Sequence, residues 1–237
     1  MMFRSAQLRF IAEDTLLVEF GDSLDDNLHN KVLMLDSALS ESSIAAHLET
    51  LPTFRSLMIQ FDVFALSAES LLEALSNLDI SSVKFKGQTW RVPVCFENGC
   101  AQDLAEVSDK LGITEAEIIE RILHSPLKLY MYGFAPGFAY LGGLDTKLNI
   151  TRRDTPRAPM PQGALMIAGG LASLSSVSMP TGWYVLGQTP VTMFSLQRKA
   201  LVPFAVGDEL QLYPLDFDTF IKLQAAPGIA GVERMIK

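Results

Sequence analysis

Cysteine and histidine are scarce in this chain, whose 237 residues include 2 cysteines and 3 histidines. Cys95 and Cys100 lie five positions apart, and we expect reduced thiols there because no secretion signal accompanies them. The histidines stand at no ligand spacing with cysteines or carboxylates. We therefore predict no metal site.

Long apolar runs are also missing. Gly and Pro interrupt the apolar stretches before they reach the ~20 residues that a membrane helix requires. Residues 1–7 contain no continuous apolar stretch of the signal-peptide kind. We therefore expect a cytoplasmic protein without a membrane span.

Basic charge is in short supply, with 19 Lys and Arg against 27 Asp and Glu, a net charge of −8. Residues 1–90 hold 13 acidic and 6 basic residues, whereas residues 91–237 hold 14 acidic and 13 basic residues. Because a phosphate backbone requires clustered Lys and Arg, this distribution argues against nucleic acid as a partner. The nearly neutral second part can accept an anionic ligand.

An apolar fraction of 49% and a charged fraction of 19% are typical of a globular protein with a sizeable core. The order of apolar patterns predicts a small α+β domain over residues 1–86. Its predicted elements are strands at 10–12, 15–20, 56–61 and 83–87, and helices at 24–39, after Ser42 and at 67–78.

Residues 87–237 predict a mainly β domain, because short apolar runs alternate with Gly and Pro turns from Leu127 onwards. Pro93 predicts an edge position for the strand at 89–96, since proline cannot donate a ladder hydrogen bond. The other predicted elements are helices at 101–111 and 114–124, the second capped by Thr114, a strand pair within 204–213, and a last helix with a loose tail from residue 216.

Residues 130–190 combine glycine, proline, arginine and aromatic residues within otherwise apolar sequence. Glycine permits positive φ and close approach of a ligand, whereas proline fixes φ and removes a donor. Core strands avoid this mixture, so the region predicts a shaped binding surface. Its blocks read Gly133-Phe-Ala-Pro-Gly-Phe-Ala-Tyr-Leu-Gly142, Arg152-Arg-Asp-Thr-Pro-Arg157, Pro161-Gln-Gly163, Gly182-Trp183 and Gly187-Gln-Thr-Pro190.

The arginine block is the first candidate for contact with an anion. Guanidinium groups match carboxylate and phosphate oxygens in paired geometry and stay charged in any environment. Pro156 is expected to hold Arg157 on an extended segment. The alternative is that Arg152, Arg153 and Arg157 belong to a solvated loop with a salt bridge to Asp154.

The loop from Gly133 to Gly143 is the second candidate. Four aromatic residues near it alternate with small residues, which predicts rings on one face of an extended strand, either toward a ligand or in the core. They are Tyr132, Phe134, Phe138 and Tyr140. Pro136-Gly137 predicts a type II turn, which can direct backbone N–H groups toward an anion.

Three isolated residues complete the candidates. His124 ends the predicted helix at 114–124, where it fits either a structural role at the helix dipole or a general base. Trp183 follows Gly182 and either packs in the core or stacks on a ligand, and Gln188 lies in the same stretch. The chain has no P-loop or kinase signature and no spacing that supports a Ser-His-Asp or Cys-His arrangement.

The blocks between Gly133 and Pro190, in this order, resemble the KipI family, also called allophanate hydrolase subunit 1. That family includes the B-type subunit of the bacterial ATP-dependent 5-oxoprolinase, and the resemblance extends from about residue 8 to about residue 213. It implies a cyclophilin-like barrel of the carboxyltransferase-subdomain type for residues 87–237. It also suggests Arg153, Arg157 and His124 as catalytic residues. The substrate-binding candidates are Gly133, Phe134, Pro136, Gly137, Phe138, Tyr140, Arg152, Gly182, Trp183 and Gln188.

The resemblance implies a subunit of an ATP-dependent amide hydrolase that is inactive alone. The implied reaction opens 5-oxo-L-proline to L-glutamate, with ATP and Mg²⁺ bound in the assembled complex. The implied partners are a paralogous cyclophilin-like subunit of type C and a third subunit of type A. Two alternatives stay open: a subunit of an allophanate or urea-pathway amide hydrolase, and a KipI-like module that inhibits a sensor histidine kinase.

One segment departs from the family. Relatives have Gln-Thr-Gly followed by an aromatic residue and proline where this chain has Leu171-Ala-Ser173 and then Ser175-Ser176. The change removes an amide side chain and a glycine from the predicted site, and Thr181 also replaces a usual glycine. We expect residues 171–178 to form a solvated loop, and the substrate or activity to differ from the family standard.

Overall fold

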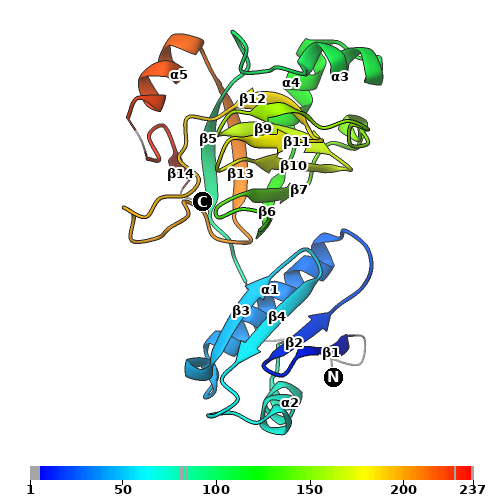
Figure 1. Cartoon of the computed structure of the whole chain (residues 1–237), viewed down its shortest axis with the longest axis vertical. Coiled ribbons are helices and arrows are strands. Elements are labelled where there is room, and N and C mark those ends of the chain that lie inside the picture. The colour runs from blue at the N-terminus through cyan, green and yellow to red at the C-terminus, as the bar shows by residue number, and fades with distance from the viewer. Residues whose placement is uncertain (1–5, 81–82, 84, 227, 236–237) are drawn as a thin grey trace. The chain divides into compact units, whose positions relative to one another are not determined.

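The computed structural model describes residues 6–80, 83, 85–226 and 228–235. The chain divides into two units, residues 1–86 and residues 87–237, each built on its own β-sheet (Figure 1). We call them unit 1 and unit 2. Among the described residues, no helix is both long enough and apolar enough to span a bilayer.

Unit 1 contains a four-stranded antiparallel sheet in the order β1-β2-β4-β3. Two α-helices accompany the sheet, and α1 packs against β3 and β4 (Figure 1). The elements are β1 (Gln7–Ala12), β2 (Thr15–Glu19), α1 (Asp26–Ser40), the 3-10 helix η2 (Ala45–His47), β3 (Leu48–Pro52), β4 (Ser56–Phe61) and α2 (Ala68–Asn77).

Side-chain caps mark the first turns of both α-helices of unit 1. The Asp25 carboxylate accepts hydrogen bonds from the N–H groups of Asn27 and Leu28 at the start of α1. The Ser67 hydroxyl accepts from the Ser70 N–H at the start of α2. Alternate strand residues join both helices in one apolar core, which includes Leu16, Val18, Leu57, Ile59, Leu35 and Leu71.

Unit 2 is mainly β. Eight strands form one sheet in the order β12-β9-β10-β7-β6-β13-β5-β14, and the pairing of Gln188 with Cys95 joins β12 to β5, which closes a ring of seven strands. Strands β5 and β13 run parallel. The strands are β5 (Thr89–Cys95), β6 (Leu127–Tyr132), β7 (Ala139–Gly142), β9 (Ala164–Ala168), β10 (Leu171–Leu174), β12 (Tyr184–Gln188), β13 (Glu209–Leu215) and β14 (Glu233–Met235).

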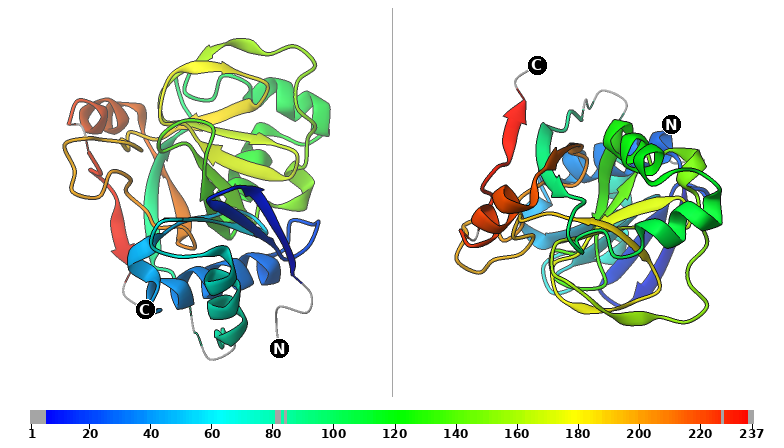
Figure 2. Two further views of the ribbon diagram at one scale, coloured as in Figure 1. Left: turned by 60° about the horizontal axis from the view of Figure 1, so that its bottom comes forward. Right: turned by 90° about the horizontal axis from the view of Figure 1, so that it is seen from above.

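A two-stranded ribbon and short helices surround this sheet. The ribbon pairs β8 with β11. The α3–α4 pair and α5 lie on opposite sides of unit 2, as the views in Figures 1 and 2 agree. These elements are β8 (Arg157–Met160), β11 (Met179–Thr181), α3 (Leu104–Leu111), α4 (Glu115–His124), the 3-10 helix η3 (Thr146–Leu148) and α5 (Phe217–Gln224).

Strand β9 shows how the sheet is buried on both faces. All of its residues are buried. Leu165 and Ile167 belong to the main core of unit 2. The alternate residues Ala164 and Met166 join a second cluster that contains Trp183. The second cluster therefore includes the predicted site residues Phe138 and Trp183, and Tyr140 packs against it.

The prediction that Pro93 marks an edge strand was wrong. Strand β5 pairs with β13 along its whole length on one side. On the other side, β14 pairs with residues 89–91 and β12 pairs with Cys95, so Pro93 falls in the gap between these two partners. Proline is tolerated in this central strand where one of its two sides has no ladder partner among the described residues.

Two elements predicted in unit 1 do not form. The N–H and the hydroxyl of Ser42 both donate to the Leu39 carbonyl at the end of α1, so Ser42 does not cap a new α-helix. Only η2 follows. Val83 and residues 85–87 lie outside any strand, and Lys84 lies outside the described residues.

The predicted strand pair within 204–213 is a single strand, β13. The Asp208 carboxylate accepts hydrogen bonds from the N–H groups of Gln88 and Ala205 and from the Trp90 indole, which stabilises a turn before β13. Asp216 caps α5, so the last predicted helix is confirmed. The tail is not wholly loose, because β14 pairs with β5.

Candidate functional site

Five of the predicted site residues meet in unit 2. The rings of Phe134, Phe138, Tyr140 and Trp183 follow one another with centroids 5.8, 5.1 and 5.9 Å apart. Arg152 lies over the last ring, with its Cζ 5.6 Å from the Trp183 centroid. The rings meet at steep angles, the arrangement that aromatic quadrupoles favour. We call these five residues the aromatic row.

The rings do not share one extended strand, so that prediction was wrong. The chain reverses between β6 and β7, where the Gly133 N–H donates to the Phe138 carbonyl. Tyr132 is separated from the row, and its hydroxyl donates to the Phe204 carbonyl. Phe138 and Trp183 are buried members of the second cluster, and Tyr140 packs against it. Tyr132 packs against the main core. The core interpretation therefore agrees with these rings, whereas Phe134 is exposed.

Phe134 lies at a strained turn. Its φ is 70°, and the Ala135 N–H donates to the Gly133 carbonyl at 2.9 Å. This is a γ-turn centred on a residue with positive φ, a rare conformation away from glycine. Although aromatic, the Phe134 side chain is 79% exposed. The chain therefore presents this ring to its surroundings at an energetic cost.

The turn predicted at Pro136-Gly137 is confirmed. Gly137 has φ 73°, and the Phe138 N–H donates to the Ala135 carbonyl. A side chain at Gly137 would meet the Met193 carbonyl at 2.7 Å, so glycine is required for space as well as conformation.

A pocket of about 370 Å³ opens on this connection, lined by Tyr132, Gly133, Phe134, Ala135, Pro136 and Gly137. The N–H groups of Gly133, Ala135 and Phe138 already donate to carbonyls of the connection. These three donors are therefore not available to an anion. The pocket instead offers a flat, largely apolar wall beside the exposed ring of Phe134.

The three arginines of the block separate into two environments. Arg152 is exposed and has no carboxylate partner among the described residues. Arg153 and Arg157 are held by Asp103, which accepts from Arg153 Nη2 at 2.9 Å and from Arg157 Nη1 at 2.6 Å. Glu106 also accepts from Arg153. Arg152 is thus the guanidinium that the fold leaves for a ligand.

The charges around the row are well defined at neutral pH. Burial opposes the charge of Arg153, but the hydrogen bond to Glu106 and the negative charges of Asp103 and Glu106 raise the pKa of Arg153 overall. Burial raises the pKa of Tyr140, and the charge of Arg152 opposes this in part. Tyr140 is therefore a neutral hydroxyl near a permanent cation.

The remaining predicted residues of this region support the row. The extended segment expected after Pro156 forms, because β8 begins at Arg157. The Gly182 carbonyl accepts from the Arg153 N–H at 2.8 Å. Gln188 is 9% exposed, and its amide donates to the Gln162 carbonyl. Gly182 and Gln188 thus hold neighbouring segments in place.

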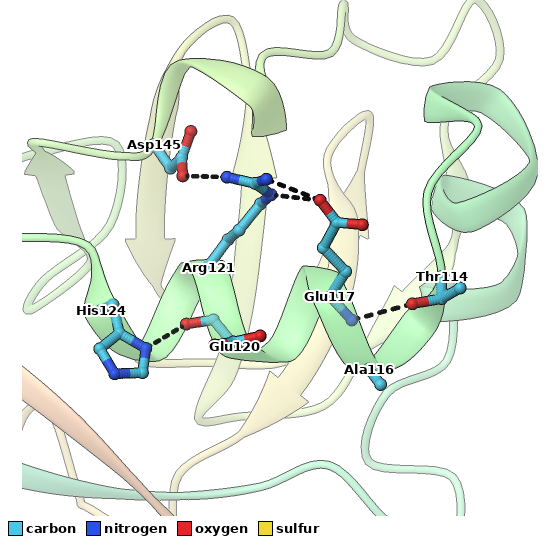
Figure 3. A pocket seen from close by; sticks show the side chains of 7 residues that line it. All are labelled: Thr114, Ala116, Glu117, Glu120, Arg121, His124 and Asp145. Carbon is cyan, nitrogen blue, oxygen red and sulfur yellow. Dashed lines mark hydrogen bonds and ion pairs between the residues drawn. The ribbon is translucent and has the colours of Figure 1, made fainter.

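His124 lies in a different pocket, of about 490 Å³, on α4 (Figure 3). Arg121 bridges it, donating to Asp145 at 2.8 Å and to Glu117 at 2.6 Å. His124 Nδ1 lies 2.8 Å from the Glu120 carbonyl. The lining residues are Thr114, Ala116, Glu117, Glu120, Arg121, His124 and Asp145. His124 is thus not brought together with the other candidates.

Comparison with known families identifies the family of this chain. A family model described as the carboxyltransferase domain, subdomain C and D, matches residues 6–204. The chain belongs to this carboxyltransferase-domain family. The B-type subunit of 5-oxoprolinase from Bacillus subtilis (strain 168) is 24% identical over 220 residues, which cover 85% of this chain and 90% of the relative. The B-type subunit of 5-oxoprolinase from Haemophilus influenzae is 30% identical over 153 residues, covering 64% and 72%.

Two solved structures share the fold. The crystal structure of TTHA0988 superposes with a TM-score of 0.76 at 23% identity, covering 89% of this chain and 40% of that one. The K. lactis urea amidolyase gives a TM-score of 0.73 at 16% identity, covering 97% of this chain and 16% of that one. This chain therefore spans less than half of either solved chain.

The solvated loop predicted for residues 171–178 is confirmed only for Val177 and Ser178, which are exposed outside any strand, and was wrong for residues 171–176. Residues 171–174 form β10, and residues 172–176 are buried. The Ser175 hydroxyl accepts from the Ala164 N–H and donates to the Pro161 carbonyl. The hydroxyls of Ser173 and Ser176 are buried without a hydrogen-bond partner among the described residues.

Sequence reasoning missed Asp103, the residue that organises the arginines. Its signal was present, because an aspartate directly before an apolar-periodic stretch is typical of a helix N-cap. That interpretation would have marked the position, but not the two arginines, which follow about 50 residues later in the chain. Arg121 and Asp145, which define the second pocket, were missed for the same reason.

Proposed function

We propose that this chain is the B-type subunit of an ATP-dependent 5-oxoprolinase that works in the cytoplasm. The observation that supports this most strongly is the match to the B-type 5-oxoprolinase subunit of B. subtilis across 90% of that relative's length. The proposed reaction opens the lactam ring of 5-oxo-L-proline to L-glutamate while ATP is converted to ADP and phosphate. We take the closed sheet of unit 2 to be the cyclophilin-like barrel of the family.

The aromatic row suits the carboxylate of such a substrate. Arg152 is an exposed guanidinium without a carboxylate partner in the described structure, and its paired donors match carboxylate oxygens. Tyr140, which is partly exposed and packs edge-on against the buried Trp183, offers its ring to a small planar lactam. In this proposal Arg152 binds and orients the substrate. Arg153 and Arg157 are already paired with Asp103 and hold the segment that carries Arg152 in place.

The row by itself does not fit ATP with Mg²⁺. Its one free guanidinium is Arg152, and the nearby carboxylates of Asp103 and Glu106 are engaged by arginines. The described residues contain no group of three or more His, Cys, Asp or Glu side chains that could hold a metal ion. We therefore place ATP in the assembled complex and derive no step from it in this chain. The proposed partners are a paralogous subunit of type C and a third subunit of type A.

One observation favours a binding module as the second candidate. Phe134 is a strained, 79% exposed aromatic side chain, a form that also suits a protein contact. A KipI-like interaction with a sensor kinase would use this ring without need for Arg152. The two candidates therefore differ in which end of the aromatic row matters.

The test is to co-express the chain with the products of its neighbouring genes, purify the assembly and measure 5-oxoproline-dependent ADP release. We expect release by the complete assembly and none when this chain is omitted. A stable assembly that releases no ADP with 5-oxoproline would sink the proposal. Release with allophanate or urea instead would assign the chain to the urea-pathway alternative.

A further inference from the structure

Asp103 directly precedes α3, but its side chain does not cap that helix. An aspartate at this position ordinarily accepts from the first N–H groups of the helix. Here the carboxylate is 6% exposed and accepts three other hydrogen bonds, from Arg153, Arg157 and the N–H of Val185. Asp103 therefore accepts hydrogen bonds from residues far away in sequence instead of capping its own helix.

Those three donors belong to the two segments that carry one end of the aromatic row. Arg153 and Arg157 lie on the segment that contains Arg152. Val185 follows Trp183 by two residues, and its N–H lies 2.7 Å from Asp103 Oδ2 while its carbonyl accepts from the Asp103 N–H at 2.9 Å. One buried carboxylate therefore ties together the backbones that present Arg152 and Trp183.

The two segments also contact each other in a register that fixes the side of each arginine. The Arg153 N–H donates to the Gly182 carbonyl, and the Arg153 guanidinium lies 4.5 Å from the centroid of the Tyr184 ring. With Arg153 directed to Tyr184 and Asp103, Arg152 is directed to Trp183.

We propose that Asp103 is a positioning residue, which sets Arg152 against Trp183 for ligand binding. It touches neither the proposed substrate nor the row itself and acts through Arg153, Arg157 and Val185. Together with Glu106 it also pairs with Arg153 and Arg157, so that Arg152 is the arginine of the block without a carboxylate partner among the described residues. The identity of the ligand rests on the proposed function, whereas the positioning does not.

The positioning is tested by ¹⁹F NMR of the full chain labelled with 5-fluorotryptophan, in which the chemical shift of Trp183 is the signal measured. The Trp183 signal is assigned by its loss in Trp183→Phe, and its dependence on the arginine by its shift in Arg152→Gln. We expect Asp103→Asn to shift the same signal, and Asp109→Asn, an exposed aspartate on the same helix, to leave it in place. A folded Asp103→Asn protein with an unmoved Trp183 signal would overturn the proposal.

A second variant guards against misfolding. Asp103→Glu keeps the charge but lengthens the side chain, and it too is expected to shift the Trp183 signal because the three hydrogen bonds cannot all be kept. If Asp103→Asn does not fold, an unmoved signal in folded Asp103→Glu overturns the proposal in the same way. A purely structural role would lower the unfolding midpoint of either variant without moving this signal.

The second readout is kinetic and uses the assembled complex. We expect Asp103→Asn to raise the KM for 5-oxoproline about tenfold with kcat changed less, since a displaced Arg152 weakens ground-state binding. An unchanged KM in an active assembly overturns the positioning. If the wild-type assembly has no 5-oxoprolinase activity, the proposed function fails, and the Trp183 signal still decides the role of Asp103.

Discussion

Unit 2 contains two regions built around an arginine, and they differ in whether that arginine is paired with carboxylates of the chain. In the pocket on α4, Arg121 donates to both Glu117 and Asp145, so its guanidinium is committed within the chain. On the aromatic row, Arg152 lies on a ring and has no carboxylate partner in the described structure. The larger pocket is therefore the one whose arginine is already paired with carboxylates, and size alone does not identify a binding site.

The two regions also differ in backbone strain, which is found on the aromatic row and not in the helix of the α4 pocket. The α4 pocket is built on a regular helix that begins with the Thr114 cap. The row ends in a γ-turn that holds Phe134 at positive φ with its ring exposed. Strained backbone persists where the surrounding structure enforces it, often at sites of function. The row is thus favoured as the surface with interactions left to offer.

The largest expected contrast is in stability. Asp103→Ala should lower the free energy of unfolding by about 3–5 kcal/mol, because it leaves two largely buried guanidiniums without their shared carboxylate. Asp145→Ala should lower it by at most ~1 kcal/mol, since that side chain is 28% exposed and Arg121 keeps Glu117. Urea denaturation of both variants measures the difference. Equal losses would mean that the two arginine regions are not distinct in the way described.

The next contrast is in ligand binding. In the assembled enzyme, Arg152→Gln should raise the KM for 5-oxoproline by about 10- to 100-fold, the loss expected for a charged hydrogen-bonding group. His124→Gln should change it less than about twofold, because His124 lies in the other pocket with Nδ1 at the Glu120 carbonyl. Steady-state kinetics of the two variants decide this. The reverse order would move the site to α4 and support the catalytic role predicted for His124.

The parts of the fold that could be predicted are those with local signals. The helix after Thr114 and the strand at Ser56–Phe61 form where expected, because caps and alternation act over a few residues. The turn at Pro136-Gly137 was predictable for the same reason. The edge-strand prediction from Pro93 failed because a central strand can hold a proline where β14 and β12 leave a gap beside it. The extent of those two strands is set by chain segments far away in sequence.

The candidate site was predictable as a set of residues but not as an arrangement. The motifs named every member of the aromatic row, yet Tyr140 and Trp183 meet only because β7 and β12 take their places in one closed sheet. Asp103 was not found, since nothing local shows that an apparent N-cap will turn to arginines elsewhere. Ser173 was placed in solvent because hydroxyl-rich sequence is typical of loops, whereas its neighbours Ala172 and Leu174 fill the main core.

A smaller effect is expected at the strained end of the row. Phe134→Gly should leave the free energy of unfolding unchanged or raise it by up to ~1 kcal/mol, because glycine adopts φ 70° without the steric penalty of a side chain. The same variant should weaken ligand or partner binding, since the exposed ring is lost. Chemical denaturation and the 5-oxoproline KM measure both effects. A destabilised variant with unchanged binding would show that Phe134 serves packing alone.

The smallest contrast is in pH dependence. Burial raises the pKa of Tyr140 above its ordinary value of 10.0, so its contribution to stability is complete below pH 10 and is lost as the pH rises through the folded-state value. On the other region, the hydrogen bond from the Lys147 N–H and that from Arg121 lower the pKa of Asp145 below 3.8, so its contribution is present above pH 3.8 and is lost as the pH falls through the folded-state value.

The two variants Tyr140→Phe and Asp145→Asn separate these contributions. Melting temperatures of Tyr140→Phe and wild type should converge or cross as the pH rises above 10.0, and those of Asp145→Asn and wild type as the pH falls below 3.8. Each variant should run parallel to wild type in the other range, because its residue does not titrate there. Parallel curves for Tyr140→Phe at alkaline pH would show that Tyr140 is solvated, and would remove the neutral hydroxyl from the surface on which Arg152 is proposed to bind its ligand.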